Sequence, residues 1–292
     1  MIVVCFACAP QAMAGPLIGI SGDFLYDIDT TTGLASNPRQ TGGAAIDIAF
    51  GDGLLYGTRL FSLSTINPAT GEAFLLGEIT GIDILETIQD LAWDPEDGVL
   101  SALVHLGGTT SRRLYTIDRT SLIATVVGQF DANYTTMSFD PQGRLFAIDR
   151  FANSLGMIDK NTAATIWAIS LSPDIFSRGS MSFTDSGELF ADTLLDDGRL
   201  ALLAIDPTDA SVVSIGGTGL SVGFNSLAYI PEPSTCCFVL FGVLGFLMRR
   251  GACRPGGLML EPSGKSVYDM MPCRGQSTFF RGIRIISKRR GT

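Results

Sequence analysis

Two aspartates, Asp47 and Asp90, are the residues of this 292-residue sequence with the clearest potential for chemistry. Each begins a short segment of the same type, and a pair of carboxylates at equivalent positions of a repeat could serve as the acid and the base of glycoside hydrolysis. The equivalent positions in the other copies hold Thr136, Ser180 and Ser226. We therefore take Asp47 and Asp90 as the candidate catalytic residues of an alternative, enzymatic hypothesis.

Other catalytic and metal-binding patterns are sparse. His105 is the only histidine and lies in the apolar segment Ser101–Leu106, where a packed or rim position is expected. A histidine-based metal cluster is therefore excluded, and a Ser-His-Asp triad would have to use His105. The segment Gly216–Gly219 lacks the Lys-Ser/Thr of a phosphate-binding loop.

The distribution of cysteines and the composition of the aspartate-rich turns also argue against a metal site in the body of the chain. Residues 15–235 contain no cysteine, which excludes disulfides and thiolate metal sites from the body of the chain. Turns such as Asp94–Gly98 hold oxygen ligands that calcium could use, but they lack the spacing of an EF-hand loop, and turn geometry already accounts for their composition. We expect no cofactor and no metal ion.

Charge divides the chain into two parts. Ten basic and 27 acidic residues precede Arg249, a net charge of −17, whereas 10 basic and 2 acidic residues make up the charge from Arg249 onward. An acidic body lacks the basic face that a phosphate backbone requires, so we expect no nucleic-acid partner.

Five short segments of the body repeat one pattern. In each, a polar residue is followed by a large apolar, a small and an aromatic residue, so strand alternation places the two bulky side chains on one face. Their last residues are 43, 46, 44 and 46 residues apart. The segments are Asp47–Phe50, Asp90–Trp93, Thr136–Phe139, Ser180–Phe183 and Ser226–Tyr229.

Each of the first four copies is followed by a tight turn and by further strand-like segments. The turns end in glycine, which supplies the positive φ that hairpins need. They are Gly51–Gly53, Asp94–Gly98, Asp140–Gly143 and Thr184–Gly187. A third series ends in Ile-Asp or Ile-Asn, and a fourth apolar segment follows. Four strands in roughly 45 residues are typical of a β-propeller blade.

The sequence therefore predicts an all-β fold, a five-bladed β-propeller with four strands per blade, over residues 15–230. Leu17–Ile20 resembles a second strand and Ser226–Tyr229 a first strand, so both termini would complete one blade and remove the sheet edges. Six blades would result if a degenerate blade lay between Ile66 and Ile117. A β-sandwich would not need five copies of one pattern, and a β-helix would have shorter coils.

The N-terminus is typical of an export signal. Ile2–Ala9 is apolar, and Ala12 and Ala14 place small residues at the −3 and −1 positions of a cleavage site before Gly15. We predict a signal peptide over residues 1–14, although no lysine or arginine precedes its apolar part. A buried N-terminal strand is the alternative.

An uncharged apolar run, Thr235–Met248, lies near the other end of the chain. As a helix its 14 residues would span about 21 Å, against roughly 30 Å for a hydrocarbon core, a difference that snorkelling by Arg249 and Arg250 could reduce. The basic flank follows the positive-inside rule. The sequence thus predicts a C-terminal hydrophobic helix that inserts into a membrane.

The residues before this run complete a recognisable signal. Pro231, Glu232, Pro233 and Ser234, then a short apolar segment with glycines, then Arg249 and Arg250 resemble the sorting signal of PEP-CTERM proteins, over residues 231–250. The resemblance implies sorting by an exosortase, a membrane-embedded protease that would cut near Pro231–Pro233. It further implies a mature protein in the outer envelope or extracellular matrix of a bacterium that makes extracellular polysaccharide.

Residues 251–292 extend beyond the point where such signals normally end. This basic tail, rich in arginine and glycine, is either a disordered extension without a selected function or a segment that binds anionic lipid headgroups.

Two functional hypotheses follow. The first is a non-enzymatic protein of the cell surface or matrix, either binding a polysaccharide or protein ligand or serving a purely structural role. The second is an exported hydrolase or lyase acting on polysaccharide, with Asp47 and Asp90 near its site.

Overall fold

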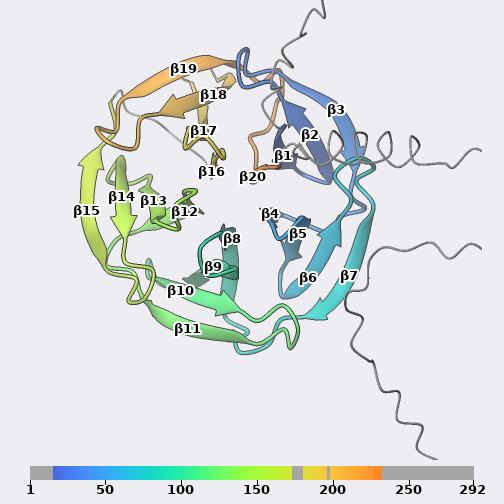
Figure 1. The fold of residues 1–292 in the computed structure, drawn as a ribbon, viewed down its shortest axis with the longest axis vertical. Coiled ribbons are helices and arrows are strands. Elements are labelled where there is room, and N and C mark those ends of the chain that lie inside the picture. The colour runs from blue at the N-terminus through green and yellow to red at the C-terminus, as the bar shows by residue number, and fades with distance from the viewer. Residues whose placement is uncertain (1–15, 173–179, 196–197, 232–292) are drawn as a thin grey trace, which may run out of the picture. The chain divides into compact units, whose positions relative to one another are not determined.

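The computed structural model describes residues 16–172, 180–195 and 198–231, which form five four-stranded antiparallel sheets around one axis (Figure 1). The strands, in chain order, are β1 (Leu17–Ser21), β2 (Phe24–Ile28), β3 (Ala35–Gln40), β4 (Asp47–Gly51), β5 (Leu54–Arg59), β6 (Ser62–Ile66), β7 (Ala73–Glu78), β8 (Glu86–Asp94), β9 (Val99–Leu106), β10 (Arg112–Ile117), β11 (Ala124–Gln129), β12 (Tyr134–Phe139), β13 (Leu145–Asp149), β14 (Ser154–Ile158), β15 (Thr165–Ser170), β16 (Met181–Phe183), β17 (Leu189–Leu194), β18 (Leu200–Ile205), β19 (Val212–Gly217) and β20 (Ser226–Tyr229).

The five sheets are the blades of a propeller. Blade 1 has the strand order β20-β1-β2-β3, and blades 2 to 5 are β4–β7, β8–β11, β12–β15 and β16–β19. The predicted all-β fold with five blades of four strands is confirmed, and the described chain holds no sixth blade. The predicted C-terminal helix lies outside the described residues, and within those that are described no helix is long and apolar enough to cross a membrane.

Both ends of the described chain complete blade 1, as the sequence predicts. β20 pairs antiparallel with β1, with Leu17 opposite Tyr229 and Ile20 opposite Ser226. Beyond this ladder, the Ile230 amide donates a hydrogen bond to the Pro16 carbonyl at 3.1 Å. The pairing satisfies backbone groups that would otherwise form an open sheet edge.

The predicted glycine turns join the first and second strands of blades 2 to 5. The φ angles of Gly53, Gly98, Gly143 and Gly187 are 75°, 66°, 74° and 86°, in the left-handed region that glycine enters without a steric penalty. These turns therefore depend on glycine at the position where the sequence repeats it.

A second turn repeats five times, after the third strand of each blade. An Asp or Asn side chain accepts a hydrogen bond from the backbone amide two residues later, at 2.8–2.9 Å, which forms an Asx turn. The acceptors are Asp29, Asn67, Asp118, Asp159 and Asp206. The Ile-Asp and Ile-Asn repeats of the sequence thus have a structural role in the fold.

The hydrophobic core consists of five clusters, each shared by two neighbouring blades. Between blades 2 and 3, for example, Tyr56 and Leu63 pack with Leu91 and Leu100. The small residues of the repeated first strands, Ala49 and Ala92 among them, line a narrow central space of about 70 Å³. Small side chains at these positions let five strands approach one axis.

Candidate functional site

The central channel opens at two mouths, at opposite ends of the first strands. The mouth where these strands begin encloses about 770 Å³, and we call it the polar mouth; its charged and amide residues are Asp47, Gln89, Arg112, Arg150 and Asn225. The mouth where the strands end encloses about 320 Å³, and we call it the aromatic mouth; it is lined by Phe50, Trp93, Phe139, Phe183 and Tyr229.

Asp90 lies in the middle of β8, the first strand of blade 3, directly after the pairing irregularity at Gln89, and is only 2% exposed. Its Oδ2 accepts hydrogen bonds from the Thr136 hydroxyl at 2.6 Å and the Met137 amide at 2.8 Å. Its Oδ1 accepts hydrogen bonds from the Leu91 amide at 2.9 Å and the Ser226 hydroxyl at 3.3 Å. Since Thr136 and Ser226 belong to blades 4 and 1, one carboxylate connects the first strands of three blades.

Asp47 occupies the equivalent position in blade 2 and lines the polar mouth, although only 4% of it is exposed. Burial raises its pKa well above the ordinary value, and the negative charge of Asp90 raises the pKa further. Burial also raises the pKa of Asp90 to about 7, against the lowering effect of its four hydrogen bonds.

The two aspartates therefore interact electrostatically, and they differ in their surroundings. Asp90 accepts four hydrogen bonds. Asp47 lies at the mouth, and its neutral form is more strongly favoured. A neutral carboxyl beside a bound ligand can donate a hydrogen bond or a proton. The structure thus brings together the two candidate residues that the sequence singled out.

Two arginines of the polar mouth were not anticipated from the sequence. Arg112, at the start of β10, is 7% exposed, and its Nη1 donates a hydrogen bond to the Thr110 carbonyl at 2.7 Å. The guanidinium of Arg150 lies 4.9 Å from the ring centre of Phe151, a residue that also lines the mouth. These residues follow no repeat, so the sequence pattern gave no signal for them.

Burial and neighbouring charges in the polar mouth shift the pKa of Arg112. Burial lowers the pKa of Arg112, the carboxylate of Asp149 opposes this shift, and the charge of Arg150 adds to it. Because the ordinary pKa of arginine lies far above neutrality, Arg112 stays charged at neutral pH. Two guanidinium groups thus act on one another at this mouth.

His105 lies on β9, in register with Arg112 of the neighbouring strand. Its Nε2 lies 2.8 Å from the Thr109 carbonyl oxygen, and the ring is partly buried. This position agrees with the packed or rim residue expected from the sequence.

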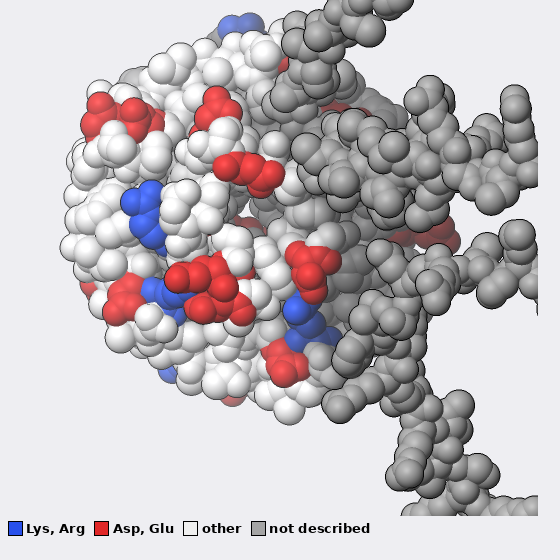
Figure 2. All heavy atoms as spheres, viewed as in Figure 1, with Lys and Arg blue, Asp and Glu red and all other residues white. Residues whose placement is uncertain are grey.

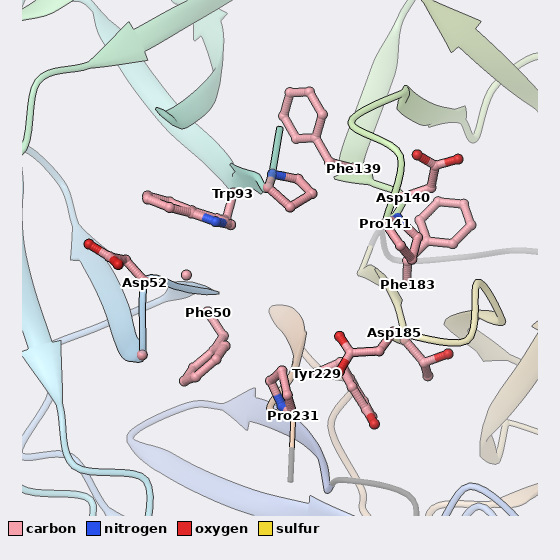
Figure 3. Close-up of a pocket in the computed structure, with 14 residues that line it drawn as sticks. Phe50, Asp52, Trp93, Phe139, Asp140, Pro141, Phe183, Asp185, Tyr229 and Pro231 are labelled. Atoms are coloured by element: carbon pink, nitrogen blue, oxygen red, sulfur yellow. The ribbon is translucent and has the colours of Figure 1, made fainter. Parts of the chain in front are cut away.

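The aromatic mouth collects the last residue of the repeated segment from every blade. Figure 3 shows Phe50, Trp93, Phe139, Phe183 and Tyr229 arranged around one opening, together with Asp52 and Asp185. The sequence identified these aromatics as one face of a strand pattern, but it did not show that all five meet. Pro231, the first residue of the predicted sorting motif, also lines this mouth.

The remaining residues of the predicted targeting segments lie outside the described part of the chain. These are the cleavage-site residues Ala12 and Ala14, the motif residues Glu232, Pro233 and Ser234, and the flanking Arg249 and Arg250. They stay predictions.

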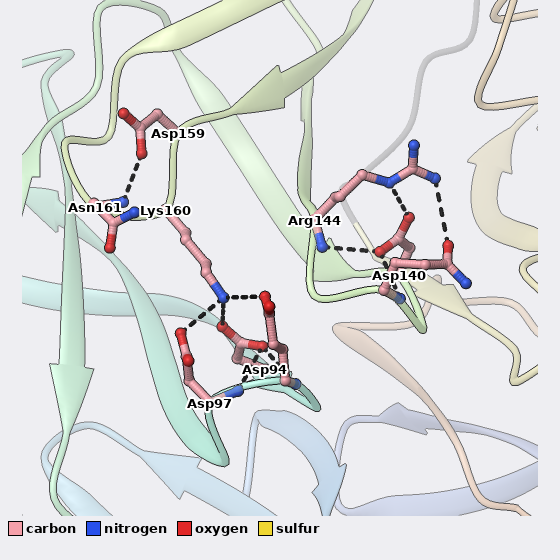
Figure 4. Close-up of polar contacts among 9 residues, drawn as sticks. Asp94, Asp97, Asp140, Arg144, Asp159, Lys160 and Asn161 are labelled. Atoms are coloured by element: carbon pink, nitrogen blue, oxygen red, sulfur yellow. Dashed lines mark hydrogen bonds and ion pairs between the residues drawn. The ribbon is translucent and has the colours of Figure 1, made fainter.

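The turn Asp94–Gly98 holds three carboxylates close enough together to bind one cation, those of Asp94, Glu96 and Asp97. The ammonium group of Lys160 lies among them, at 2.7, 2.9 and 2.7 Å from their oxygens (Figure 4). Burial lowers the pKa of Lys160, but its hydrogen bonds to the three carboxylates outweigh this and raise it above the ordinary value. The lysine thus supplies the positive charge that a metal ion would otherwise bring.

Several other basic side chains each form an ion pair with one carboxylate. Arg144 Nε donates a hydrogen bond to Asp140 Oδ2 at 2.6 Å, beside the aromatic mouth (Figure 4). Figure 2 shows that some basic side chains lie against acidic ones on the face drawn and others lie among uncharged residues.

Comparisons with known proteins show distant similarity. No protein-family model and no curated protein matches the chain. A Bacteroides caccae protein of unknown function is 11% identical, with a TM-score of 0.44 over 75% of this chain and 100% of that chain. A Xanthomonas campestris gluconolactonase is 11% identical, with a TM-score of 0.44 over 71% and 78% of the two chains.

Kuenenia stuttgartiensis hydrazine synthase is 15% identical, with a TM-score of 0.42 over 58% of this chain. The present chain covers 48%, about half, of that chain. Similarities at this level carry no argument about substrate or reaction, so function has to be argued from the site.

Proposed function

We propose that this protein is an exported cell-surface or matrix propeller that binds a ligand at its polar mouth, without catalysis. The observation that carries the proposal is the composition of that mouth. Two arginines, a buried carboxyl with a raised pKa and two amides converge in a cavity of about 770 Å³, within the ~300–1,000 Å³ typical of pockets for small organic ligands.

Sorting through the C-terminal segment is the second part of the proposal. The fold closes at Tyr229 and Ile230, directly before Pro231, so recognition of the motif would not require unfolding of a blade. Pro231 lies at the aromatic mouth and the proposed ligand site at the polar mouth. A protease acting at the motif and a ligand in the polar mouth would therefore not compete for the same residues.

Mass spectrometry of the protein from its native cells tests the sorting. Intact mass and C-terminal peptide mapping of each cell fraction should find a mature form that begins at Gly15 and ends near Pro233, in the outer envelope or the medium. A chain extending to Thr292 in the inner membrane would contradict processing by an exosortase.

A hydrolase or lyase that acts on polysaccharide at the polar mouth is the second candidate. The interacting pair Asp47 and Asp90 favours it, because buried carboxyls with raised pKa values are typical of acid–base catalysis. Asp47→Asn should then abolish hydrolysis of polysaccharide from the native cells but weaken its binding much less, because an amide can still form hydrogen bonds with a hydroxyl. Binding without turnover in the unaltered protein would support the non-enzymatic function.

A further inference from the structure

The polar mouth contains two buried polar atoms without hydrogen-bond partners in the described part of the chain, Arg112 Nε and Gln89 Oε1. Both residues line the mouth, and Gln89 occupies the irregularity in the pairing of β8 with β9. Buried polar groups in native proteins are nearly always paired with protein groups, water or a ligand, so two unpaired groups at one opening mark a place where a partner from outside the protein can bind.

The first requirement on this partner is a negative charge. Among the described residues, no carboxylate forms an ion pair with Arg112 or Arg150, whereas Arg39, Arg113, Arg119 and Arg144 each have one. The Asp149 carboxylate near Arg112 already accepts hydrogen bonds from the amides of Asn133, Phe151 and Ala152. An anionic group would complete the guanidinium contacts of the mouth.

The second requirement is a hydrogen-bond donor. Gln89 Oε1 can only accept hydrogen bonds, and an ionised carboxylate has no proton to give it. A hydroxyl group can satisfy this oxygen, and the carboxyl of Asp47 can pair with a second hydroxyl. The ligand therefore carries hydroxyl groups as well as an anionic group.

The third requirement comes from the rim. Phe151 is 66% exposed, and Ile46, Leu194 and Val222 are also exposed around the same opening. An exposed aromatic ring and aliphatic side chains can pack against the C–H face of a sugar ring, which buries apolar surface while the polar groups point inward.

We propose that the polar mouth binds a carboxylate-bearing sugar, the hexuronic acid unit of an acidic saccharide. Arg112 and Arg150 would bind its carboxylate, Gln89 and Asp47 its hydroxyls, and Phe151 its ring face. Both unpaired atoms are closed to solvent in the free protein, so binding includes a small rotation of these side chains. This inference rests on the proposed function, since it names the ligand class of the same mouth.

An acidic peptide meets the requirements less well. Its carboxylates would satisfy the arginines and its backbone amides could donate to Gln89, but acidic side chains present little apolar surface to the exposed ring of Phe151. We therefore argue for the saccharide and include the peptide as an outcome of the test.

The experiment is calorimetric titration of the full-length chain, in detergent micelles at pH 7, with a glucuronic acid trisaccharide. A glucose trisaccharide of the same linkage and a hexaglutamate peptide are titrated alongside. The variants are Arg150→Gln, which changes a surface residue, Gln89→Leu, and the matched control Arg144→Gln near the aromatic mouth. Thermal melting confirms that each variant folds.

We expect the glucuronic acid trisaccharide to bind, and Arg150→Gln to weaken binding by roughly tenfold or more, as for loss of a charge-assisted hydrogen bond. Gln89→Leu should also weaken it, and Arg144→Gln should not. Equal binding of the glucose trisaccharide, tighter binding of hexaglutamate, insensitivity to Arg150→Gln, or no binding at all would each overturn the inference.

These outcomes are distinguishable from failure of the proposed function. Binding of the glucose trisaccharide in the polar mouth would leave a surface binding protein with a different ligand class. Conversely, a full-length chain in the inner membrane of the native cells would reject the sorting proposal, even if the uronate binds in the titration.

Discussion

Thr136 donates a 2.6 Å hydrogen bond from its hydroxyl to Asp90 Oδ2, with both side chains almost completely buried. The two residues hold equivalent positions in neighbouring blades, and Ser226 contacts Asp90 from the equivalent position of a blade that is not its neighbour. Two of the three hydroxyls at positions equivalent to the catalytic candidates are therefore partners of one of those candidates, whereas the third, that of Ser180, donates a hydrogen bond to Asp192. Asp90 has a structural role across the axis, whatever else it does.

Asp90→Asn should destabilise the propeller, because the amide nitrogen cannot accept the hydrogen bonds that one carboxylate oxygen accepts. We expect a loss of roughly 1–3 kcal/mol in unfolding free energy, the usual cost of unpaired buried polar groups. Thr136→Val should cost less, and a double-mutant cycle by chemical denaturation should give a coupling energy above about 0.5 kcal/mol. Additive effects would show that the 2.6 Å contact contributes no coupling.

Buried carboxyls should make the propeller lose stability as the pH rises from about 4 towards neutrality. Burial raises the pKa of Asp192 to about 6 and that of Asp90 to about 7, from an ordinary value of 3.8. Between these values the unfolded chain releases protons that the folded chain retains, so the unfolding free energy falls with increasing pH. Their stabilising contribution is complete below about pH 4.

Melting temperatures between pH 4.5 and pH 7 measure this slope. The Asp192→Asn variant has no titrating group at this position. Its melting temperature should therefore fall less steeply with increasing pH up to about pH 6. Asp206→Asn is the matched control, because hydrogen bonds from Thr208 lower the pKa of Asp206 and move its effect below pH 3.8. Identical slopes for Asp192→Asn and the unaltered protein would contradict the assignment.

Lys160→Gln should destabilise blades 3 and 4, since it leaves the buried Asp94 carboxylate without its cationic partner. We expect a loss of roughly 1–3 kcal/mol. The variant should also gain stabilisation by calcium, because its three carboxylates then lack a neutralising charge. Melting with and without calcium measures both effects. A calcium-stabilised unaltered protein would contradict the role assigned to Lys160.

Gly51→Ala should disturb the aromatic mouth by steric overlap. A Cβ atom at Gly51 would lie 1.9 Å from Cδ2 of Trp93, whose ring stacks on Tyr56 with 6.2 Å between centroids and lies beneath Arg119. We expect a cost of roughly 1–3 kcal/mol and a change in tryptophan fluorescence. Gly217→Ala, where the nearest atom is 3.7 Å away, is the control and should leave both properties unchanged.

The fold could be predicted from the sequence because its determinants are local and repeated. Each blade carries its own first-strand pattern, its own glycine turn and its own Asx turn, such as those at Gly143 and Asp159. Alternation of side chains along a strand and the positive φ of glycine are properties of neighbouring residues. Closure between β1 and β20 could be predicted for the same reason, since each terminus carries one part of a repeated unit.

The residues of the polar mouth could not be predicted as one site, because they are far apart in the sequence and no local pattern specifies the distances between them. Arg112, Arg150 and Gln89 occur once each, outside the repeat, and they share a mouth only because five blades close around one axis. The convergence of Asp90 with Ser226, 136 residues away, likewise depends on ring closure. Sequence periodicity determined the blades, because each blade forms from adjacent strands. The tertiary structure alone decided which unrepeated side chains meet at the axis, because that depends on how all five blades pack together.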